Sequence, residues 1–271
     1  MNLAQRAAIV VPCVALGAAL HAQQLKPETE RDFACYVQSA EARWEGRTAF
    51  LLADSDPALN AKLVSGQIQT TPAEGANPRK IAGGQLYDWM GSVFIPGTSL
   101  DRLIQMLKDY DHRAQYFPEI LSASKLLCHS GDKHFRFTMR LKEPAVIDTE
   151  NDVAWERVDP RRWRCRSYST NAHEIGKDHG YLLRLYSYWR FAEVDKGVYA
   201  EAETITLSRE FGGFTRALGS MMGISPEKSL RRTLASMRAS VLKPEFRFAD
   251  PPAGMAECGA AFRPSGCAAG K

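Results

Sequence analysis

The sequence of 271 residues has little net charge and no compositional bias towards disorder or fibre formation. Its 35 lysines and arginines face 31 aspartates and glutamates, which leaves a formal charge of only +4. A surplus this small, without a basic run interleaved with aromatic residues, argues against a dedicated nucleic-acid-binding protein. Apolar residues at 45% and charged residues at 24% are ordinary for a folded domain, which excludes a disordered tail, a collagen-like fibre and a polytopic membrane protein.

Motifs of the common enzyme classes are also absent. The sequence has no Gly-x-Ser-x-Gly elbow, no glycine-rich phosphate loop, no His-Glu-x-x-His pair and no dinucleotide fingerprint. These absences disfavour hydrolase, kinase, metalloprotease and dehydrogenase functions. No Cys-x-x-Cys pair occurs and the cysteines lack metal-ligand spacing to histidines, so a structural zinc site is not expected. With the enzyme motifs also missing, the sequence predicts no metal site, no cofactor and no catalytic residue.

The first segment with a clear signal is a targeting sequence. Arg6 precedes the apolar run Ala7–Leu20, and the small residue Ala22 stands just before a polar stretch. This pattern predicts a secretory signal over residues 1–22, cut near Ala22, and an exported protein that is periplasmic or secreted. The run is too short to span a bilayer comfortably, and an uncleaved membrane anchor is the alternative.

Export makes disulfides possible among the cysteines that remain after cleavage. An odd number of them leaves at least one free thiol or an intermolecular link. Cys258 and Cys267 stand close together in a tail rich in glycine, alanine and proline, where a small loop closed by them is the expected pair. The remaining cysteines are Cys35, Cys128, Cys165, Cys258 and Cys267.

Residues 23–83 are predicted to form an N-terminal helix and a linker. The helix covers about Glu28–Asp54, where Phe33, Val37, Ala40 and Trp44 recur at helical spacing and form one apolar stripe. The linker is rich in proline and glycine and contains one short strand candidate, Lys62–Thr70. Residues 244–271 form a low-complexity tail.

Residues 84–243 form the predicted main domain, with an α+β layout. A first strand, Leu86–Ile95, precedes a helix capped by Thr98. A final helix starts at Ser225 and Pro226 and ends before Pro244. In between lie the strand candidates Lys133–Lys142, Val153–Val158, Trp163–Thr170, Tyr181–Val194 and Val198–Ser208.

One of these strands alternates almost perfectly. In Lys133–Lys142 the residues Phe135, Phe137, Met139 and Leu141 share one face, with polar residues on the other. This period of two indicates a half-buried strand of an antiparallel sheet. Together with the final helix, it predicts a curved antiparallel sheet wrapped around that helix.

The main domain resembles START-related proteins of the helix-grip superfamily, which includes polyketide cyclases and plant lipid-binding allergens. The resemblance covers about residues 84–242 and is carried by five segments. It implies an internal cavity between the sheet and the terminal helix that holds an apolar ligand, and it brings no catalytic motif. The segments are Trp89–Gly97, Leu107–His112, Tyr116–Ile120, Trp189–Phe191 and Val198–Arg209.

The loop between the last two predicted strands decides which side chains face that interior. A three-residue loop with Gly197 in a left-handed conformation sets Val194 opposite Val198. A two-residue loop instead places Arg190 opposite Glu201 as an exposed ion pair. We favour the three-residue loop because it gives the more apolar inner face, which holds Ser187, Trp189, Tyr199, Glu201 and Glu203.

Two buried carboxylates in such a cavity must pair, take up a proton or bind a ligand. We expect Glu201 and Glu203 to anchor the polar end of an apolar ligand or to act as acid–base groups with a raised pKa. The alternative is a structural network with arginines such as Arg140 or Arg157. The predicted ligand-binding residues are Glu201, Glu203, Trp89, Trp189, Ser187, Tyr199, Phe137 and Met139.

Two loops are weaker candidates. His173 and His179 flank Glu174 and Asp178, which offers a metal site, although a solvated loop over the cavity mouth is the favoured interpretation. The apolar, glycine-bearing segment Phe211–Phe214 suits a gate over the cavity or a short packing helix.

Three functions remain after these exclusions. The leading one is an exported carrier that binds a lipid-like or aromatic small molecule in a dry internal cavity. A cyclase- or aromatase-like enzyme is the alternative, and a protein with a filled core that acts through its surface is the third. The expected partner is a hydrophobic small molecule or lipid, peripheral membrane contact is left open, and nucleic acid is not expected.

Overall fold

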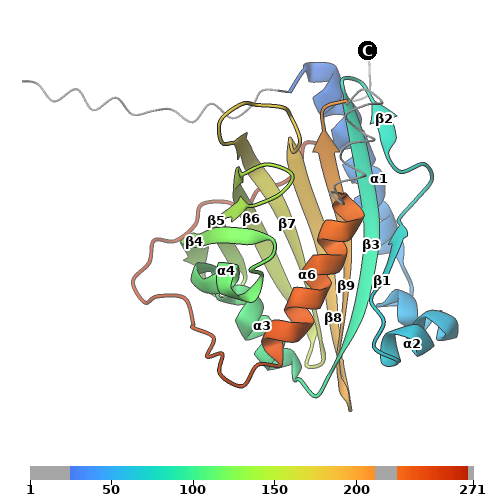
Figure 1. The fold of residues 1–271 in the computed structure, drawn as a ribbon, viewed down its shortest axis with the longest axis vertical. Helices are drawn as coiled ribbons and strands as arrows, with labels where there is room; N and C mark the ends of the chain where they lie inside the picture. The colour runs from blue at the N-terminus through green and yellow to red at the C-terminus, as the bar shows by residue number, and fades with distance from the viewer. Residues whose placement is uncertain (1–24, 211–224, 268–271) are drawn as a thin grey trace, which may run out of the picture.

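A curved antiparallel sheet organises the chain in the computed structural model, which describes residues 25–210 and 225–267 (Figure 1). Within these residues the sheet has nine strands in the order β1-β3-β9-β8-β7-β6-β5-β4, and β2 also pairs with β3. The strands are β1 (Gln69–Pro72), β2 (Arg79–Ile81), β3 (Gly84–Pro96), β4 (Leu121–Ser130), β5 (His134–Leu141), β6 (Ile147–Asp159), β7 (Arg162–Glu174), β8 (Arg184–Val194) and β9 (Gly197–Ser208).

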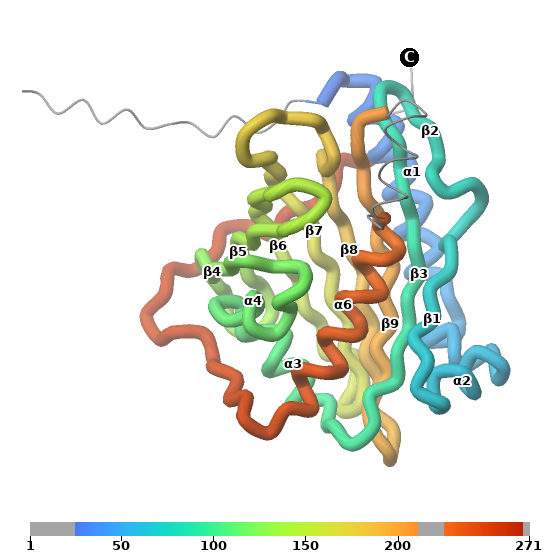
Figure 2. The backbone as a smooth tube through the Cα atoms, in the orientation of Figure 1, coloured from blue at the N-terminus to red at the C-terminus, as the bar shows by residue number. Residues whose placement is uncertain are grey.

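Helices cover both faces of this sheet, so the predicted α+β helix-grip fold is confirmed (Figure 1). The helix α6 crosses the concave face, and α1 lies on the convex face (Figure 2). None of the helices in the described part of the chain is long and apolar enough to cross a membrane. The helical elements are α1 (Pro27–Gly46), η1 (Leu52–Asp54), α2 (Pro57–Val64), α3 (Leu100–Lys108), η2 (Tyr110–His112), α4 (Arg113–Tyr116) and α6 (Pro226–Val241).

The helix α6 begins as the sequence predicts. The Ser225 side chain accepts a hydrogen bond from the Lys228 backbone N–H, and Pro226 occupies the first turn. The predicted inward stripe of α6 is buried. This stripe packs against Gly91 of β3. A Cβ atom on Gly91 of β3 would lie 2.8 Å from Leu230 and Leu234, so glycine is what lets this helix approach so closely. The buried stripe is Leu230, Leu234, Met237 and Val241.

The helix α1 buries its apolar stripe on the opposite face of the sheet. Phe33, Val37, Ala40 and Trp44 are all buried, as predicted, against side chains of β3, β7, β8 and β9. The helix ends at Gly46 rather than near Asp54, which belongs to the separate turn η1. The sheet therefore has a hydrophobic core on each side.

The C-terminal tail joins these two sides. It leaves α6, passes the β4 edge of the sheet and returns towards α1 (Figure 1). Disulfides link Cys128 to Cys258 and Cys35 to Cys267, so the predicted Cys258–Cys267 loop is wrong. Cys165 is the free cysteine among the described residues, and it is buried.

Three further local predictions need correction. Ser99, not Thr98, caps α3, since its hydroxyl accepts the Arg102 N–H. The strand candidate Lys62–Thr70 is mostly the end of α2 and a turn, and β1 begins only at Gln69. The strand β4 was not predicted, because its apolar residues do not alternate regularly and two bulges shift its pairing with β5. The gate candidate Phe211–Phe214 lies outside the described residues.

Candidate ligand cavity between the sheet and α6

A cavity of about 500 Å³ lies between the concave face of the sheet and the helices α3, α4 and α6. This volume falls in the range of sites that hold small molecules in proteins. Most of its wall is apolar and comes from many different elements. The apolar lining residues include Leu107, Phe117, Ile120, Leu121, Phe137, Met139, Leu141, Ile147, Val153, Trp155, Leu182, Leu185, Trp189, Phe191, Leu230 and Met237.

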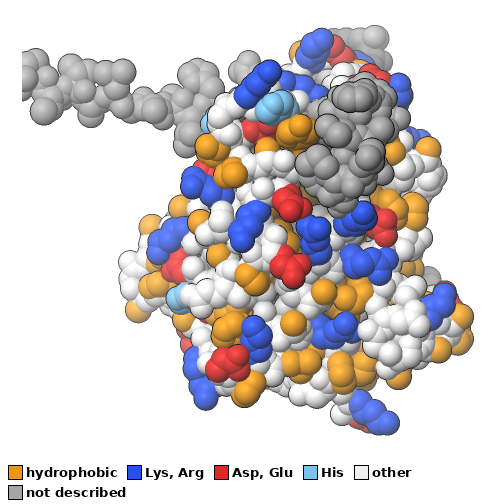
Figure 3. Space-filling model, viewed as in Figure 1, with side chains coloured by type: hydrophobic (Ala, Val, Ile, Leu, Met, Phe, Trp, Pro, Cys, Tyr) orange, Lys and Arg blue, Asp and Glu red, His pale blue; other side chains and the backbone are white. Residues whose placement is uncertain are grey.

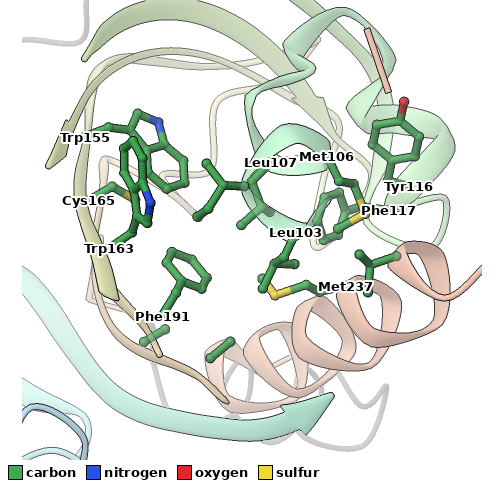
Figure 4. Close-up of a cluster of buried hydrophobic side chains, with 14 of the residues drawn as sticks. Leu103, Met106, Leu107, Tyr116, Phe117, Trp155, Trp163, Cys165, Phe191 and Met237 are labelled. Carbon is green, nitrogen blue, oxygen red and sulfur yellow. The ribbon is translucent and has the colours of Figure 1, made fainter. Parts of the chain in front are cut away.

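A cluster of buried hydrophobic side chains lies against the cavity, and several of its members also line it (Figure 4). Leu103 and Leu107 of α3 point towards Trp155 and Phe191 of the sheet, and Met237 comes from α6 (Figure 4). The Trp189 and Phe191 rings stack with an interplanar angle of 2° and centroids 5.9 Å apart. The amphipathic helix α3 contributes its buried face to this cluster, which we call the floor.

Cys165 belongs to the same floor and also lines the cavity. Burial raises the pKa of its thiol to about 12, despite the nearby cations of Arg113 and Lys108. The thiol is therefore protonated at neutral pH, and a neutral thiol is a weak nucleophile. Its position suits packing against a ligand better than covalent chemistry.

Hydroxyl groups form a polar row across the otherwise apolar sheet. Ser167 of β7 pairs with Ser187 of β8, which in turn pairs with Thr204 of β9, and all three line the cavity. The Trp189 indole N–H donates to the Ser187 hydroxyl over 3.1 Å. Thr206 also lines the cavity, and its buried hydroxyl has no partner among the described residues. The sheet thus offers several hydroxyls to a ligand.

Arg113, at the start of α4, is a partly buried charged group in the wall. Its guanidinium lies 5.4 Å from the Tyr110 ring, 5.4 Å from the Phe117 ring and 5.2 Å from the Phe137 ring. The Nη1 atom donates to the Leu107 carbonyl over 2.9 Å, while Nε is buried without an acceptor in the described residues. Burial lowers the pKa of this guanidinium.

Exposed residues mark the mouth of the cavity. Glu119 and Glu143 line it and are exposed, and Glu143 forms a salt bridge of 2.7 Å with Arg232 of α6. On the face that carries α6, positive and negative side chains are interspersed, without a patch of one sign (Figure 3). A ligand that enters here meets a mixed surface and then an apolar interior.

Four of the eight predicted ligand residues line this cavity: Phe137, Met139, Ser187 and Trp189. Trp89 lies on the same concave face, opposite Thr204, but packs against the floor cluster and does not line the space. That these side chains bind a ligand remains a prediction.

The other three predicted residues lie on the convex face, because the three-residue hairpin loop is wrong. Val194 pairs with Gly197 across a two-residue loop, and Arg190 therefore faces Glu201. A shift of one residue turns every side chain of a strand to the opposite face. Tyr199 consequently packs on Phe94, with ring centroids 4.7 Å apart.

Glu201 and Glu203 are buried beneath α1 and are absent from the cavity wall. Glu201 lies 2.6 Å from Arg47 and accepts the Leu52 N–H over 2.7 Å. Glu203 lies 3.4 Å from Arg43. Burial and the neighbouring carboxylate of Asp88 raise the pKa of Glu203 to about 8. The expected arginine network exists, but with partners other than Arg140 and Arg157.

The loop that contains His173 and His179 forms hydrogen bonds within itself. Glu174 is buried and accepts the His179 backbone N–H over 2.8 Å, with the His179 ring 3.2 Å away. His173 is exposed. In the described ranges no group of three or more potential ligands is placed to hold a metal ion.

The fold resembles START-domain proteins and polyketide aromatase/cyclases among the solved structures. A STAR-related lipid transfer protein fragment from Xanthomonas axonopodis is 15% identical, with 64% of this chain and 99% of that chain covered and a TM-score of 0.46. Human StAR-related lipid transfer protein 5 is 10% identical, over 76% of this chain and 93% of that chain, with a TM-score of 0.42. The Zhui aromatase/cyclase from Streptomyces sp. R1128 is 13% identical, over 58% and 93% of the two chains, with a TM-score of 0.42. No protein-family model and no curated protein matches the sequence.

Sequence reasoning missed two groups of cavity residues. Thr204 and Thr206 follow directly from the two-residue hairpin, whose register places them beside Ser187 and Leu185. Arg113 stands between two segments that carry the resemblance, and the signal for it was the cluster of aromatic residues on both sides, including Tyr110 and Phe117.

Proposed function

We propose that this protein binds a hydrophobic small molecule, lipid-like or aromatic, in the cavity between the sheet and α6. The observation that carries the proposal is the space of about 500 Å³ with a mostly apolar wall and a short row of hydroxyls. An apolar guest gains by leaving water for such a space, and few polar groups are needed to orient it. The names of the structural neighbours include lipid transfer and aromatase/cyclase activity, but the proposal rests on the cavity.

The cyclase-like alternative depended on Glu201 and Glu203 as interior acid–base groups. Both lie on the convex face, so no specific residue now favours that function. A filled core that binds nothing is disfavoured by the size of the cavity.

Two measurements test binding. Solvent extraction of the purified protein, followed by mass spectrometry, is expected to release a hydrophobic compound. The neutral dye Nile red is expected to gain fluorescence with the wild-type protein and to be displaced by that compound.

A pair of matched variants locates the site. Thr204→Phe fills the cavity and is expected to weaken dye binding by at least about tenfold. Thr138→Phe places the same ring on the outer face of β5 and is expected to leave binding within about twofold. Equal dye binding by both folded variants would place the site elsewhere and contradict the proposal.

We further propose that the protein is exported after cleavage near Ala22. Two disulfides support an oxidising compartment. Cell fractionation and the intact mass of the mature chain test this: a cytoplasmic protein that keeps residues 1–22 would contradict it.

A further inference from the structure

The cavity wall contains a positive charge that the protein itself does not neutralise. Arg113 lines the cavity and has no carboxylate within salt-bridge distance in the described parts of the chain. Of five guanidinium N–H donors, only those on Nη1 reach an acceptor there, the Leu107 carbonyl. Arg113 is partly buried and its Nε atom is fully buried, and a cation removed from water without a counter-ion is costly, so such groups normally pair.

The neighbouring acids are all engaged elsewhere or exposed. Asp109 lies 2.7 Å from the His112 ring and also accepts the Tyr116 hydroxyl. Asp111 pairs with Lys125 over 3.1 Å and accepts the Leu126 N–H. At the mouth, Glu143 pairs with Arg232, and Glu119 is exposed.

Three other arginines that are partly or fully buried have more acceptors than Arg113, although the Arg190 Nε also lacks one in the described residues. Arg47 pairs with Glu201, and Arg43 lies within 3.4 Å of both Asp88 and Glu203. Arg190 has no carboxylate but donates to the carbonyls of Trp44, Ala49 and Phe50. Arg113 differs from these in having one acceptor and in facing an open space.

The aromatic surroundings hold Arg113 in this position. Tyr110, Phe117 and Phe137 place their rings within 5.4 Å of the guanidinium, and all three line the cavity. Ring faces stabilise a cation without using its N–H donors. The donors thus remain available for planar, bidentate contact with an oxyanion.

We propose that Arg113 binds the anionic head group, a carboxylate or a phosphate, of an amphiphile whose apolar body occupies the cavity. This inference rests on the proposed function and narrows its ligand class. The head replaces the missing counter-ion, and the apolar tail contacts the sheet and α6. Arg113 therefore sets the preference for anionic over neutral ligands of the same length.

The test compares probes that share a chain and differ in the head. Titration calorimetry at pH 7.5 measures the affinity of the full protein for laurate, dodecyl phosphate and dodecanol. The wild-type protein is expected to bind laurate or dodecyl phosphate at least about tenfold more tightly than dodecanol, since charge-assisted contacts are the strong ones. The better of the two anions identifies the head group.

Three variants separate recognition from structure. In Arg113→Gln, the affinities for the anionic probes and for dodecanol are expected to agree within about twofold, while the dodecanol affinity stays unchanged. Arg113→Lys is expected to retain part of the preference for anions. Arg140→Gln removes an exposed arginine outside the cavity lining, so this variant is the control and should keep the wild-type ratio. Thermal unfolding checks that each variant is folded, and the ratio is read only within one variant, so a general loss of stability does not imitate the result.

Two results would overturn the inference. Equal wild-type affinity for anions and dodecanol would show that Arg113 only holds the Leu107 carbonyl. An unchanged ratio in Arg113→Gln would assign the preference to another residue. Absence of binding by all three probes, together with no Nile red binding, would instead contradict the proposed function itself.

Discussion

The two faces of the sheet differ in whether their charged side chains have partners of opposite charge. On the convex face, Glu201 and Glu203 are covered by α1 and lie against Arg47 and Arg43. On the concave face, Arg113 borders a space of about 500 Å³ and has no carboxylate partner in the described residues. The comparison teaches that burial alone does not mark a binding site, because both convex glutamates have arginine partners within the protein.

If the convex face serves stability and the concave face serves binding, convex-face variants lose stability and leave ligand affinity unchanged. We call this the division between the two faces. The largest effect is expected from the disulfides, which close chain separations of 232 and 130 residues. Replacing Cys35 and Cys267 by serine is expected to lower the free energy of unfolding by about 2–5 kcal/mol, measured by urea denaturation. Nile red affinity of the folded variant should not change; a large drop would show that α1 shapes the cavity.

The next effect concerns the buried pair on the convex face. Glu201→Gln leaves Arg47 without its carboxylate and is expected to cost about 3 kcal/mol of unfolding free energy. Glu156→Gln is the control, because Glu156 is 56% exposed where it pairs with Arg164 and should cost less than about 1 kcal/mol. Equal losses for the two variants, or weaker laurate binding in Glu201→Gln, would contradict the division.

A third effect is a pH dependence that arises beneath α1. Glu203 interacts with Asp88, Arg43 and Tyr188, while Tyr36 contacts Asp88 and Glu74 contacts Arg43. Burial raises the pKa of Glu203 from 4.5 to about 8. The folded chain therefore keeps a proton that the unfolded chain releases above pH 4.5. Stability is fully present below that pH and falls as the pH rises to 8, by at most about 1.4 kcal/mol per pH unit.

The variant Glu203→Gln tests this dependence. It removes the Glu203 carboxyl and leaves that of Asp88, so its unfolding free energy should fall less between pH 5 and pH 8.5 than that of the wild-type protein. Urea denaturation at the two pH values gives both slopes. Identical slopes would show that Glu203 does not hold the proton.

The smallest effect concerns the concave face. Gly91→Ala puts a Cβ 2.8 Å from side-chain carbons of Leu230 and Leu234, so these side chains or α6 must move, at a cost of about 1–2 kcal/mol. Nile red affinity should change as well, because Leu230 lines the cavity. Gly46→Ala, with nothing within 4 Å of its Cβ, should lose no stability and serves as the control. Unchanged binding in Gly91→Ala would separate the ligand site from α6.

Much of the fold could be predicted from periodicity. The stripes of α1, α3 and α6 and the inward face of β5 follow from spacing alone, because in each case only one side is buried. The same logic predicted the inward face of β8 correctly, with Ser187 and Trp189 towards the cavity.

The spacing of apolar residues gave the wrong inward face for β9, because both faces of that strand are buried. Ile205 and Leu207 pack under α1, while the small residues Ala200 and Ala202 face α6 and the floor. Choosing the more apolar face as the inner one was therefore the wrong criterion. The site residue Arg113 depended on how α4 meets β5, which a single sequence does not specify.

The order of the cysteines along the chain has a consequence for how the protein matures. Cys35 emerges first and Cys128 second, but each must wait for a partner in the last residues, Cys267 and Cys258. A link between Cys35 and Cys128 would therefore be non-native. If the protein is exported as proposed, we expect an isomerase that exchanges such a link to raise the yield of the correct connectivity.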